Sequence, residues 1–168
     1  HIARPFYPGP AGHDLLDLRT LGSHGHFTYD PGFMSTGSCE SSITYIDGGK
    51  GVLLHRGYPI EQLADESNYI ELCYLLLNGE LPTKEQYEAF AQEITHNTML
   101  DTKIANFFQG FRFDAHPMAM LCGVVGALSS FYHEDLDITD ATQRKTSAIK
   151  LVAKLPTNEA KAENNKGG

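Results

Sequence analysis

Hydrophobic residues alternate with polar or small residues early in the chain. Ile43 and Tyr45 precede a glycine-rich segment, 47–51, and Val52 and Leu54 follow it at the same two-residue spacing. β-Branched, aromatic and branched aliphatic residues in alternation, separated by glycines that accept positive φ angles, are typical of two strands joined by a tight turn. The pattern therefore predicts a β-hairpin.

A second turn is expected upstream of this hairpin. Asp30-Pro31-Gly32 combines a proline, which fixes φ at about −65°, with a glycine that tolerates positive φ. An extended run at Thr28 and Tyr29 leads into this turn and completes a meander of three short extended segments. We therefore predict an amino-terminal β-rich region over residues 1–57.

From residue 58 the hydrophobic spacing becomes helical and predicts a mainly α-helical fold. The expected helices cover residues 58–64, the segment between Ser67 and Gly79, a segment that begins at Lys84, and residues 101–111, 117–131 and 140–154. The second of them is apolar on most sides and is expected to be buried.

Local signals predict where several of these helices begin and end. Ser67 is a candidate amino-terminal cap of the second helix, and Gly79 is a candidate stop. Thr83-Lys84-Glu85-Gln86 has the spacing of a capping box, in which the threonine and glutamine side chains bind each other's backbone N–H groups.

The last helix is expected to end early. Thr139 or Asp140 caps it, and Pro156, which has no N–H to donate, stops it. Residues 158–168 contain no apolar residue larger than alanine. The helical part is therefore predicted over residues 58–157, followed by a loose polar tail over 158–168.

The fifth helix, residues 117–131, contains almost no polar residue and invites interpretation as a membrane span. It is shorter than the roughly 20 residues that a bilayer core requires, and its small residues are of the kind that let another helix approach closely. We expect a buried central or interface helix.

Composition excludes some classes of partner. The 168 residues are 41% hydrophobic, enough for one domain with a buried core. The formal net charge of −8 and the scattered Lys and Arg residues leave no basic surface for nucleic acid. Residues 1–10 carry three prolines and no apolar run, so we expect neither a signal peptide nor a membrane anchor. Three widely spaced cysteines fit reduced thiols in a cytoplasmic protein.

Several ordered segments resemble a known enzyme family. They are YDPGFMSTGSCES, ITYIDGGKGVLLHRGYPIEQLA, YIELCYLLLNGELPT and HPMAMLCGVVGALSSFYH. In this order they resemble the amino-terminal part of a type II (bacterial) citrate synthase, over roughly residues 14–157. The resemblance implies the first part of the multi-helical large domain of that enzyme, with a small β-hairpin region before it.

The resemblance also implies a function for the full-length relative. Citrate synthases are acyltransferases of the tricarboxylic acid cycle that condense acetyl-CoA with oxaloacetate, and the similar 2-methylcitrate synthases use propionyl-CoA. Their catalytic histidines and aspartate lie further along the chain than this sequence reaches, so no catalytic, cofactor-binding or metal-binding residue is assigned. The relatives are cytoplasmic homo-oligomers, typically dimers assembled into a hexamer. The chain alone is expected to be inactive.

The polar end after Thr157 departs from the family pattern, and three explanations stay open. The sequence is a truncated domain, a naturally shortened paralogue that acts as a regulatory or interaction module, or an incomplete sequence. The module would associate with a complete citrate synthase through its helix surfaces.

Many type II enzymes are inhibited by NADH at a pocket built from amino-terminal helices. By resemblance, Thr98, Met99, Tyr132 and Lys154 match residues of that pocket. Sensitive relatives have Arg-His before the Thr-Met pair and an arginine four residues before the lysine. This chain has His96-Asn97 and Lys150 at those positions. Lysine grips a phosphate only as a point charge, so we expect NADH to bind weakly or not at all.

Other candidate chemistry has a structural explanation. His24 and His26 could supply two metal ligands with Asp30 or His13, but no recognised ligand spacing accompanies them. Cys39 has no base placed beside it.

Two further motifs are also better explained by structure. Gly48-Gly49-Lys50-Gly51 lacks phosphate-loop spacing and suits a hairpin turn. Asp114 and His116 are expected to form a structural hydrogen-bond pair or to cap the fifth helix.

Overall fold

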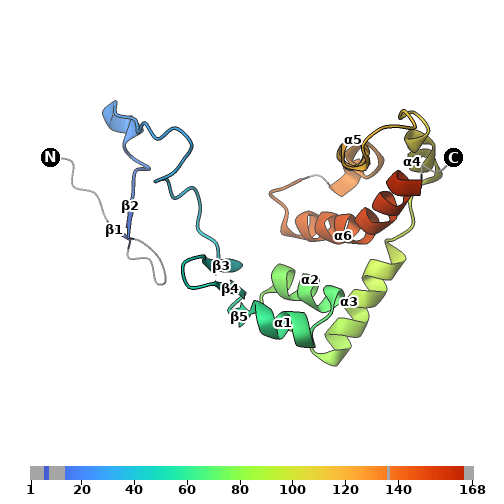
Figure 1. The fold of residues 1–168 in the computed structure, drawn as a ribbon, viewed down its shortest axis with the longest axis horizontal. Coiled ribbons are helices and arrows are strands. Elements are labelled where there is room, and N and C mark those ends of the chain that lie inside the picture. The colour runs from blue at the N-terminus through green and yellow to red at the C-terminus, as the bar shows by residue number, and fades with distance from the viewer. Residues whose placement is uncertain (1–5, 8–13, 136, 165–168) are drawn as a thin grey trace. The chain divides into compact units, whose positions relative to one another are not determined.

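The computed structural model describes residues 6–7, 14–135 and 137–164 (Figure 1). Its backbone divides into two compact units, His1–Ser42 and Ile43–Gly168, and each is described by itself. Helices dominate the second unit, so the predicted mainly α-helical class is confirmed.

The first unit contains little regular structure among its described residues. Strands β1 (Phe6–Tyr7) and β2 (Leu15–Leu16) pair antiparallel, and a short 3₁₀ helix, η1 (Gly22–His24), follows. The predicted turn at Asp30 is confirmed, because the Phe33 N–H donates to the Asp30 carbonyl (3.1 Å) and Gly32 has a φ of +87°. The extended run before this turn is not part of any sheet.

The predicted hairpin is present at the start of the second unit. Strands β3 (Thr44–Asp47) and β4 (Val52–His55) are antiparallel, with Tyr45 opposite Leu54. The third strand of the meander lies after the hairpin, not before it as expected. It is β5 (Tyr58–Pro59), which pairs with β4 because the tight turn at Arg56 and Gly57 brings it back alongside.

Three helices follow the sheet: α1 (Ile60–Glu66), α2 (Tyr69–Asn78) and α3 (Lys84–His96). The capping box at the start of α3 and the left-handed Gly79 that ends α2 are confirmed. Asn68, not the expected Ser67, caps α2, because its side-chain oxygen accepts from the Glu71 N–H. The expectation that α2 is buried all round is wrong, since of its residues only Leu75 is buried.

A second group comprises α4 (Thr102–Phe108), α5 (Pro117–Phe131), the 3₁₀ helix η2 (His133–Asp135) and α6 (Ala141–Asn164). Helix α4 ends three residues earlier than expected, whereas α5 has its predicted bounds. The His116 imidazole caps α5 by accepting from the Met118 N–H (3.2 Å). Asp140 caps α6 by accepting from the Thr142 and Gln143 N–H groups.

Helix α6 does not stop at Pro156 as expected, but continues to Asn164. Proline removes one backbone hydrogen bond and strains the preceding turn. Burial on both sides of the proline overrides this cost: Ile149 and Ala153 before it and Asn158 after it are each 2% exposed or less. Residues 158–164 are therefore helical instead of a loose tail, and residues 165–168 lie outside the described part of the chain.

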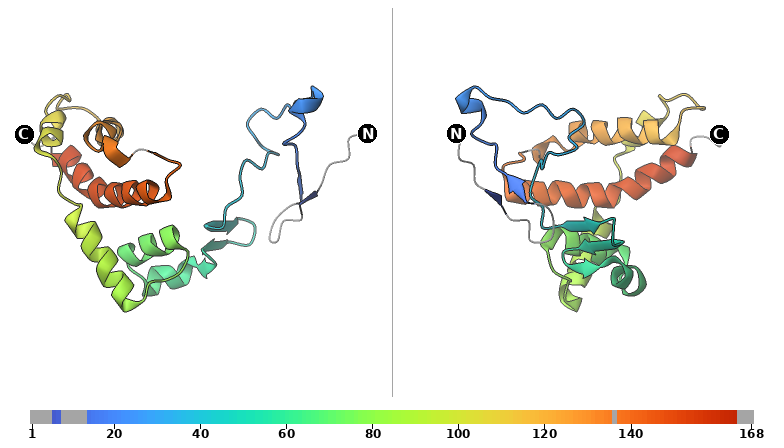
Figure 2. Two further views of the ribbon diagram at one scale, coloured as in Figure 1. Left: turned by 180° about the vertical axis from the view of Figure 1, so that it is seen from behind. Right: turned by 60° about the vertical axis from the view of Figure 1, so that its left-hand side comes forward.

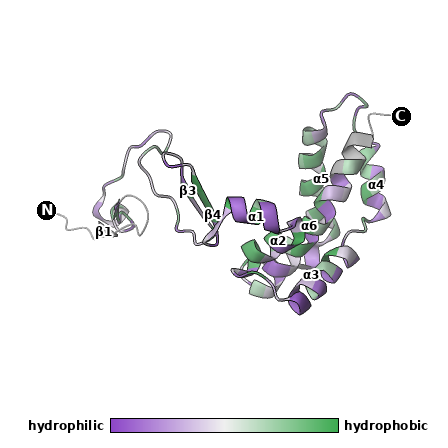
Figure 3. Cartoon of the chain, turned by 60° about the horizontal axis from the view of Figure 1, so that its bottom comes forward, coloured by the Kyte–Doolittle hydropathy of each residue, from purple (hydrophilic) through white to green (hydrophobic). Residues whose placement is uncertain are grey.

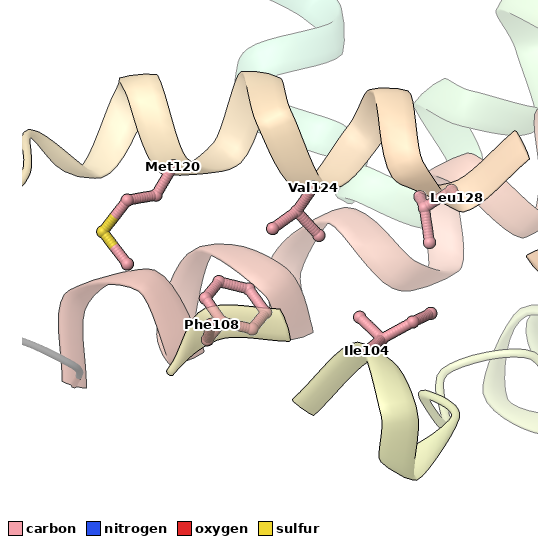
Figure 4. Packing of buried hydrophobic residues seen from close by; sticks show 5 residues of the cluster. All are labelled: Ile104, Phe108, Met120, Val124 and Leu128. Carbon is pink, nitrogen blue, oxygen red and sulfur yellow. The ribbon is translucent and has the colours of Figure 1, made fainter. Parts of the chain in front are cut away.

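Two clusters of buried side chains hold the helices together. The first joins α4 to α5 and contains Ile104, Phe108, Met120, Val124 and Leu128 (Figure 4). The second joins α3 to α6 and contains Phe90, Ile94, Ile149 and Ala153. Each cluster uses side chains three or four positions apart on each helix, as helix packing requires.

Helix α5 is buried along one face only. Figure 3 colours it largely as hydrophobic, yet small residues on its other side are exposed, among them Ala119, Cys122 and Gly126. Gly123 is also needed for packing, because a Cβ atom there would lie 3.3 Å from the Phe111 ring. The expected burial of α5 is thus met along the stripe that includes Met120, Val124 and Leu128.

Replacing Asn158 on α6 is expected to make the fold more stable. Its side chain is fully buried, and neither amide atom has a hydrogen-bond partner among the described residues. Replacing it with leucine removes an uncompensated desolvation cost, so we expect Asn158→Leu to raise the free energy of unfolding by about 1–3 kcal/mol. Urea unfolding followed by circular dichroism measures this change.

Asn106→Leu, on the exposed side of α4, is the matched control. It gains only the better helix propensity of leucine, at most about 0.5 kcal/mol. A loss of stability in Asn158→Leu would show that the amide is satisfied in solution.

Candidate functional site

A pocket lies between α5 and α6. The two helices pack against each other and are drawn in orange and red in Figure 2. Each helix supplies four residues at positions i, i+3, i+4 and i+7. The lining residues are Val125, Leu128 and Ser129 from α5 with its C-cap residue Tyr132, and Ser147, Lys150, Leu151 and Lys154 from α6. This spacing places one stripe of each helix on the same pocket.

The wall of the pocket is mainly apolar, and two of its lysines lie close to one aromatic ring. Its volume is about 210 Å³, and aliphatic side chains of Val125, Leu128 and Leu151 contribute to its wall. Tyr132 follows the last residue of α5, and the ammonium groups of Lys150 and Lys154 lie 5.4 and 4.9 Å from the centre of its ring. Both distances suit cation–π contacts.

Lys154 is 4% exposed, and its ammonium group is held by backbone oxygens. The Nζ atom donates to the carbonyls of Asn97 (2.6 Å) and Met99 (2.9 Å). Burial lowers the pKa of Lys154, and the charge of nearby Lys150 lowers it further. Lys154 therefore links α6 to the loop between α3 and α4.

The same loop accepts a third hydrogen bond from α6. The Thr157 hydroxyl donates to the Thr98 carbonyl (3.4 Å), while the Thr98 hydroxyl turns back to the Thr95 carbonyl (2.8 Å). The Met99 side chain is 79% exposed. Thr98 and Met99 thus contact α6 through their backbones and do not line the pocket.

The structure therefore brings the four predicted residues together in two ways. Tyr132 and Lys154 line the pocket. The carbonyl of Met99 accepts from Lys154, and the carbonyl of Thr98 accepts from Thr157. Sequence reasoning missed the aliphatic and serine positions of the wall. The helical spacing back from Tyr132 and Lys154 is the signal that would have found them.

The other candidates take structural positions. Asp30 accepts from the Thr36 hydroxyl and from the Ser35 N–H, and these hydrogen bonds lower the pKa of its carboxyl group. His24 ends η1. Cys39 is an exposed free thiol. His13, the other proposed ligand, lies outside the described residues. Within the described part of the chain, no group of three or more His, Cys, Asp or Glu residues is placed to hold a metal ion.

The remaining motifs also have local roles. The Asp47 carboxylate accepts from the Lys50 N–H in the hairpin turn (3.0 Å). Asp114 pairs with Arg112 (2.8 Å), not with His116 as one expectation had it, because the arginine two residues away offers two donors. Among the helices of the described residues, none combines the length and apolarity that crossing a membrane needs.

A family model described as "Citrate synthase, C-terminal domain" matches residues 32–168. The chain belongs to the citrate synthase family. Among the described residues, the matched range contains strands β3, β4 and β5, helices α1 to α6 and the pocket between α5 and α6. The predicted type II subtype and the predicted amino-terminal position within the citrate synthase chain stay predictions.

Three solved citrate synthases have similar structures. The enzyme from Thermotoga maritima MSB8 is 28% identical, with a TM-score of 0.70 over 84% of this chain and 36% of its own. The enzyme from Pyrobaculum aerophilum is 28% identical, with a TM-score of 0.73 over 98% of this chain and 39% of its own.

The third, from Thermoplasma acidophilum, was solved as a ternary complex with carboxymethyl coenzyme A and oxaloacetate. It is 19% identical, with a TM-score of 0.76 over 83% of this chain and 36% of its own, and it supports the fold. The chain thus spans between one third and two fifths of the length of these citrate synthases.

The role of Lys154 is testable by substitution. Lys154→Met leaves the Asn97 and Met99 carbonyls without their donor, so we expect the free energy of unfolding to fall by about 1–3 kcal/mol. Hydrogen exchange of the loop over residues 97–99 should become faster. Urea unfolding and amide exchange measure the two effects.

Lys145→Met, at an exposed position of the same helix, should stay within about 0.5 kcal/mol of wild type. The pKa of Lys154 is lower in the folded than in the unfolded chain, so the unfolded chain binds more protons between the two values. The contribution of Lys154 to stability should therefore rise as the pH increases towards the ordinary lysine pKa of about 10.4. Equal stability of wild type and Lys154→Met at every pH contradicts the anchoring role.

Proposed function

We propose that this chain is the amino-terminal part of a type II citrate synthase, whose complete form condenses acetyl-CoA with oxaloacetate to give citrate and CoA. The observation that carries the proposal is the match of the helical unit to citrate synthases at 28% identity, over 36–39% of their length. In this proposal the chain supplies scaffold helices, and the remainder of the enzyme supplies the chemistry.

The local roles of the acidic and histidine side chains support catalytic inactivity of the chain alone. The condensation needs a carboxylate to remove a methyl proton of acetyl-CoA and histidines to polarise the carbonyl groups. Asp101 and Asp140 cap helices, His116 caps α5, and Asp114 is engaged by Arg112. These side chains are engaged in helix capping or an ion pair, and such hydrogen bonds compete with a catalytic role.

The proposal extends to location and assembly. We assign the complete protein to the cytoplasm, consistent with three free thiols, and to homo-oligomers, consistent with the exposed small residues of α5. A 2-methylcitrate synthase, which uses propionyl-CoA, has the same architecture and is the alternative for the acyl substrate.

An activity assay tests the proposal. The 168-residue chain, confirmed by an intact mass of 18.5 kDa, is mixed with acetyl-CoA and oxaloacetate, and release of the CoA thiol is followed. We expect no release above background, while the Thermotoga maritima citrate synthase in the same assay turns over. Turnover by the chain itself would refute catalytic inactivity.

Sequencing the transcript past the codon for Gly168 tests whether the chain is the amino-terminal part of a longer enzyme. A continuing reading frame that encodes the rest of a citrate synthase supports it. An immediate stop codon favours the shortened, non-catalytic module.

For the pocket between α5 and α6 we propose weak NADH binding. Lys154 already donates to two carbonyls and contacts Tyr132, which limits its use as a phosphate ligand. Lys150 offers one charge where an arginine would offer a bidentate fork. The pocket of about 210 Å³ is also smaller than the roughly 300–1,000 Å³ of sites for drug-sized ligands.

Fluorescence titration of NADH into the chain measures this affinity. We expect no saturation in the low micromolar range, because the phosphates lack bidentate donors. Lys150→Arg restores the fork and should tighten binding, whereas Lys145→Arg, outside the pocket, should not. A wild-type dissociation constant in the low micromolar range contradicts the proposal.

A further inference from the structure

We propose that Asn78 is a deamidation site, which stays closed while the last turn of helix α2 is folded and reacts when that turn opens. Asn78 is the only asparagine in the sequence that precedes a glycine, and its side chain is exposed to water. The proposal does not depend on citrate synthase activity or on the pocket between α5 and α6. It follows from the hydrogen bonds at the end of α2.

The reaction consumes only water. The backbone nitrogen of Gly79 attacks the side-chain carbonyl carbon of Asn78, a C–N bond forms, and the side-chain amide leaves as ammonia with the proton that the Gly79 nitrogen gives up. The succinimide ring then takes up one water molecule, which breaks either of its two C–N bonds and leaves an aspartate or an isoaspartate. Glycine favours this ring, because it has no Cβ atom to hinder the attacking nitrogen.

Both reacting groups are held by the preceding turn of α2. The Gly79 N–H donates to the Leu75 carbonyl (2.8 Å), and the Asn78 side-chain amide donates to the Tyr74 carbonyl (3.0 Å). A helical side chain tilts toward the amino-terminal end of its helix, whereas the next backbone nitrogen lies toward the carboxyl-terminal end. The side-chain carbonyl carbon of Asn78 is therefore kept from the Gly79 nitrogen until these hydrogen bonds break.

The acceptors of these hydrogen bonds belong to the fixed part of the helix. Leu75 is fully buried, and the Tyr74 ring packs edge-on against Phe90 of α3, with 5.3 Å between the ring centres. Asn78 itself is exposed. We therefore expect α2 to open from its carboxyl-terminal end, over residues 76–79, while the preceding turn stays in place.

Arg56 opposes this opening from outside the helix. It lies in the turn between β4 and β5, and its guanidinium group donates to the Leu76 carbonyl from Nε (3.2 Å) and from Nη2 (2.7 Å). The last carbonyls of a helix have no donor within the helix, and the positive charge of arginine suits the negative end of the helix dipole. Arg56 therefore holds the turn that has to open before Asn78 can react.

Deamidation prevents the end of α2 from closing again. The product carries a carboxylate in place of the amide, so residue 78 can no longer donate to the Tyr74 carbonyl. A negative charge at this end of a helix is also unfavourable, because the helix dipole is negative there. An isoaspartate adds one carbon to the backbone and shifts the Gly79 N–H out of register. A single opening event is thus converted into a permanent change of the fold.

The test follows deamidation of the full chain, folded and unfolded in urea, by peptide mass spectrometry. Trypsin releases residues 57–84 as one peptide that contains both Asn68 and Asn78. We expect Asn78 to deamidate at least about tenfold more slowly in the folded chain, because two hydrogen bonds must break first. Asn68 is the internal control and should react more slowly than Asn78 in urea, because Tyr69 hinders the attack.

Matched arginine variants test the role of the last turn. Arg56→Met should raise the rate in the folded chain about tenfold, because hydrogen bonds from a charged group are lost, and should leave the rate in urea unchanged. Arg112→Met is the control, since Arg112 also makes two hydrogen bonds to one residue, Asp114, before α5. Its rate should stay within about twofold of wild type. Circular dichroism establishes that each variant folds.

Hydrogen exchange of the Gly79 amide provides an independent readout of the same opening. Exchange and deamidation should accelerate by the same factor in Arg56→Met. Low concentrations of urea open the end of α2 in the wild-type chain, and there too the two rates should rise together. This second measurement stands even where Arg56→Met fails to fold.

Equal deamidation of Asn78 in the folded and the unfolded chain would overturn the proposal, as would the absence of any reaction in urea. The proposal is also wrong where Gly79 exchange accelerates without deamidation, or where Arg112→Met acts like Arg56→Met. These measurements involve neither release of CoA nor binding of a nucleotide. Their failure therefore leaves the citrate synthase proposal and the weak nucleotide proposal standing.

Discussion

Helix α6 is the element on which the packing of the helical unit depends, because it contacts α3, α4 and α5. Ile149 and Ala153 join the cluster of α3, while Lys150, Leu151 and Lys154 line the pocket beside α5. Without α6 the apolar side chains of α3 and the wall of α5 would face water. The loss of burial, roughly 25 cal/mol for each Å² of apolar surface, exceeds the cost of one proline inside the helix.

Two polar side chains on this helix, Lys154 and Asn158, are costly to bury, and they differ in their hydrogen bonding. Lys154 gains two carbonyl acceptors and a tyrosine ring, so its burial fixes the loop between α3 and α4. Asn158 has no partner for its amide among the described residues. The difference shows that α6 is buried mainly through its apolar neighbours, and that each polar group either finds a partner or weakens the fold.

Membership of the citrate synthase family and the chemistry of the pocket address different questions. The family follows from similarity over residues 32–168, whereas the pocket follows from one stripe of each of two helices. The ammonium groups of Lys150 and Lys154 lie near the Tyr132 ring, and Val125, Leu128 and Leu151 contribute aliphatic side chains to the wall. This wall contains none of the catalytic groups, which we propose lie elsewhere in the complete enzyme.

The sequence by itself determined the elements whose ends depend on local hydrogen bonds. The hairpin around Gly51, the capping box at Thr83 and the bounds of α5 follow from neighbours a few residues apart. The end of α6 and the inward position of Lys154 were decided by tertiary structure. Lys154 binds carbonyls 55 and 57 residues away, and no local pattern reports contacts at that separation.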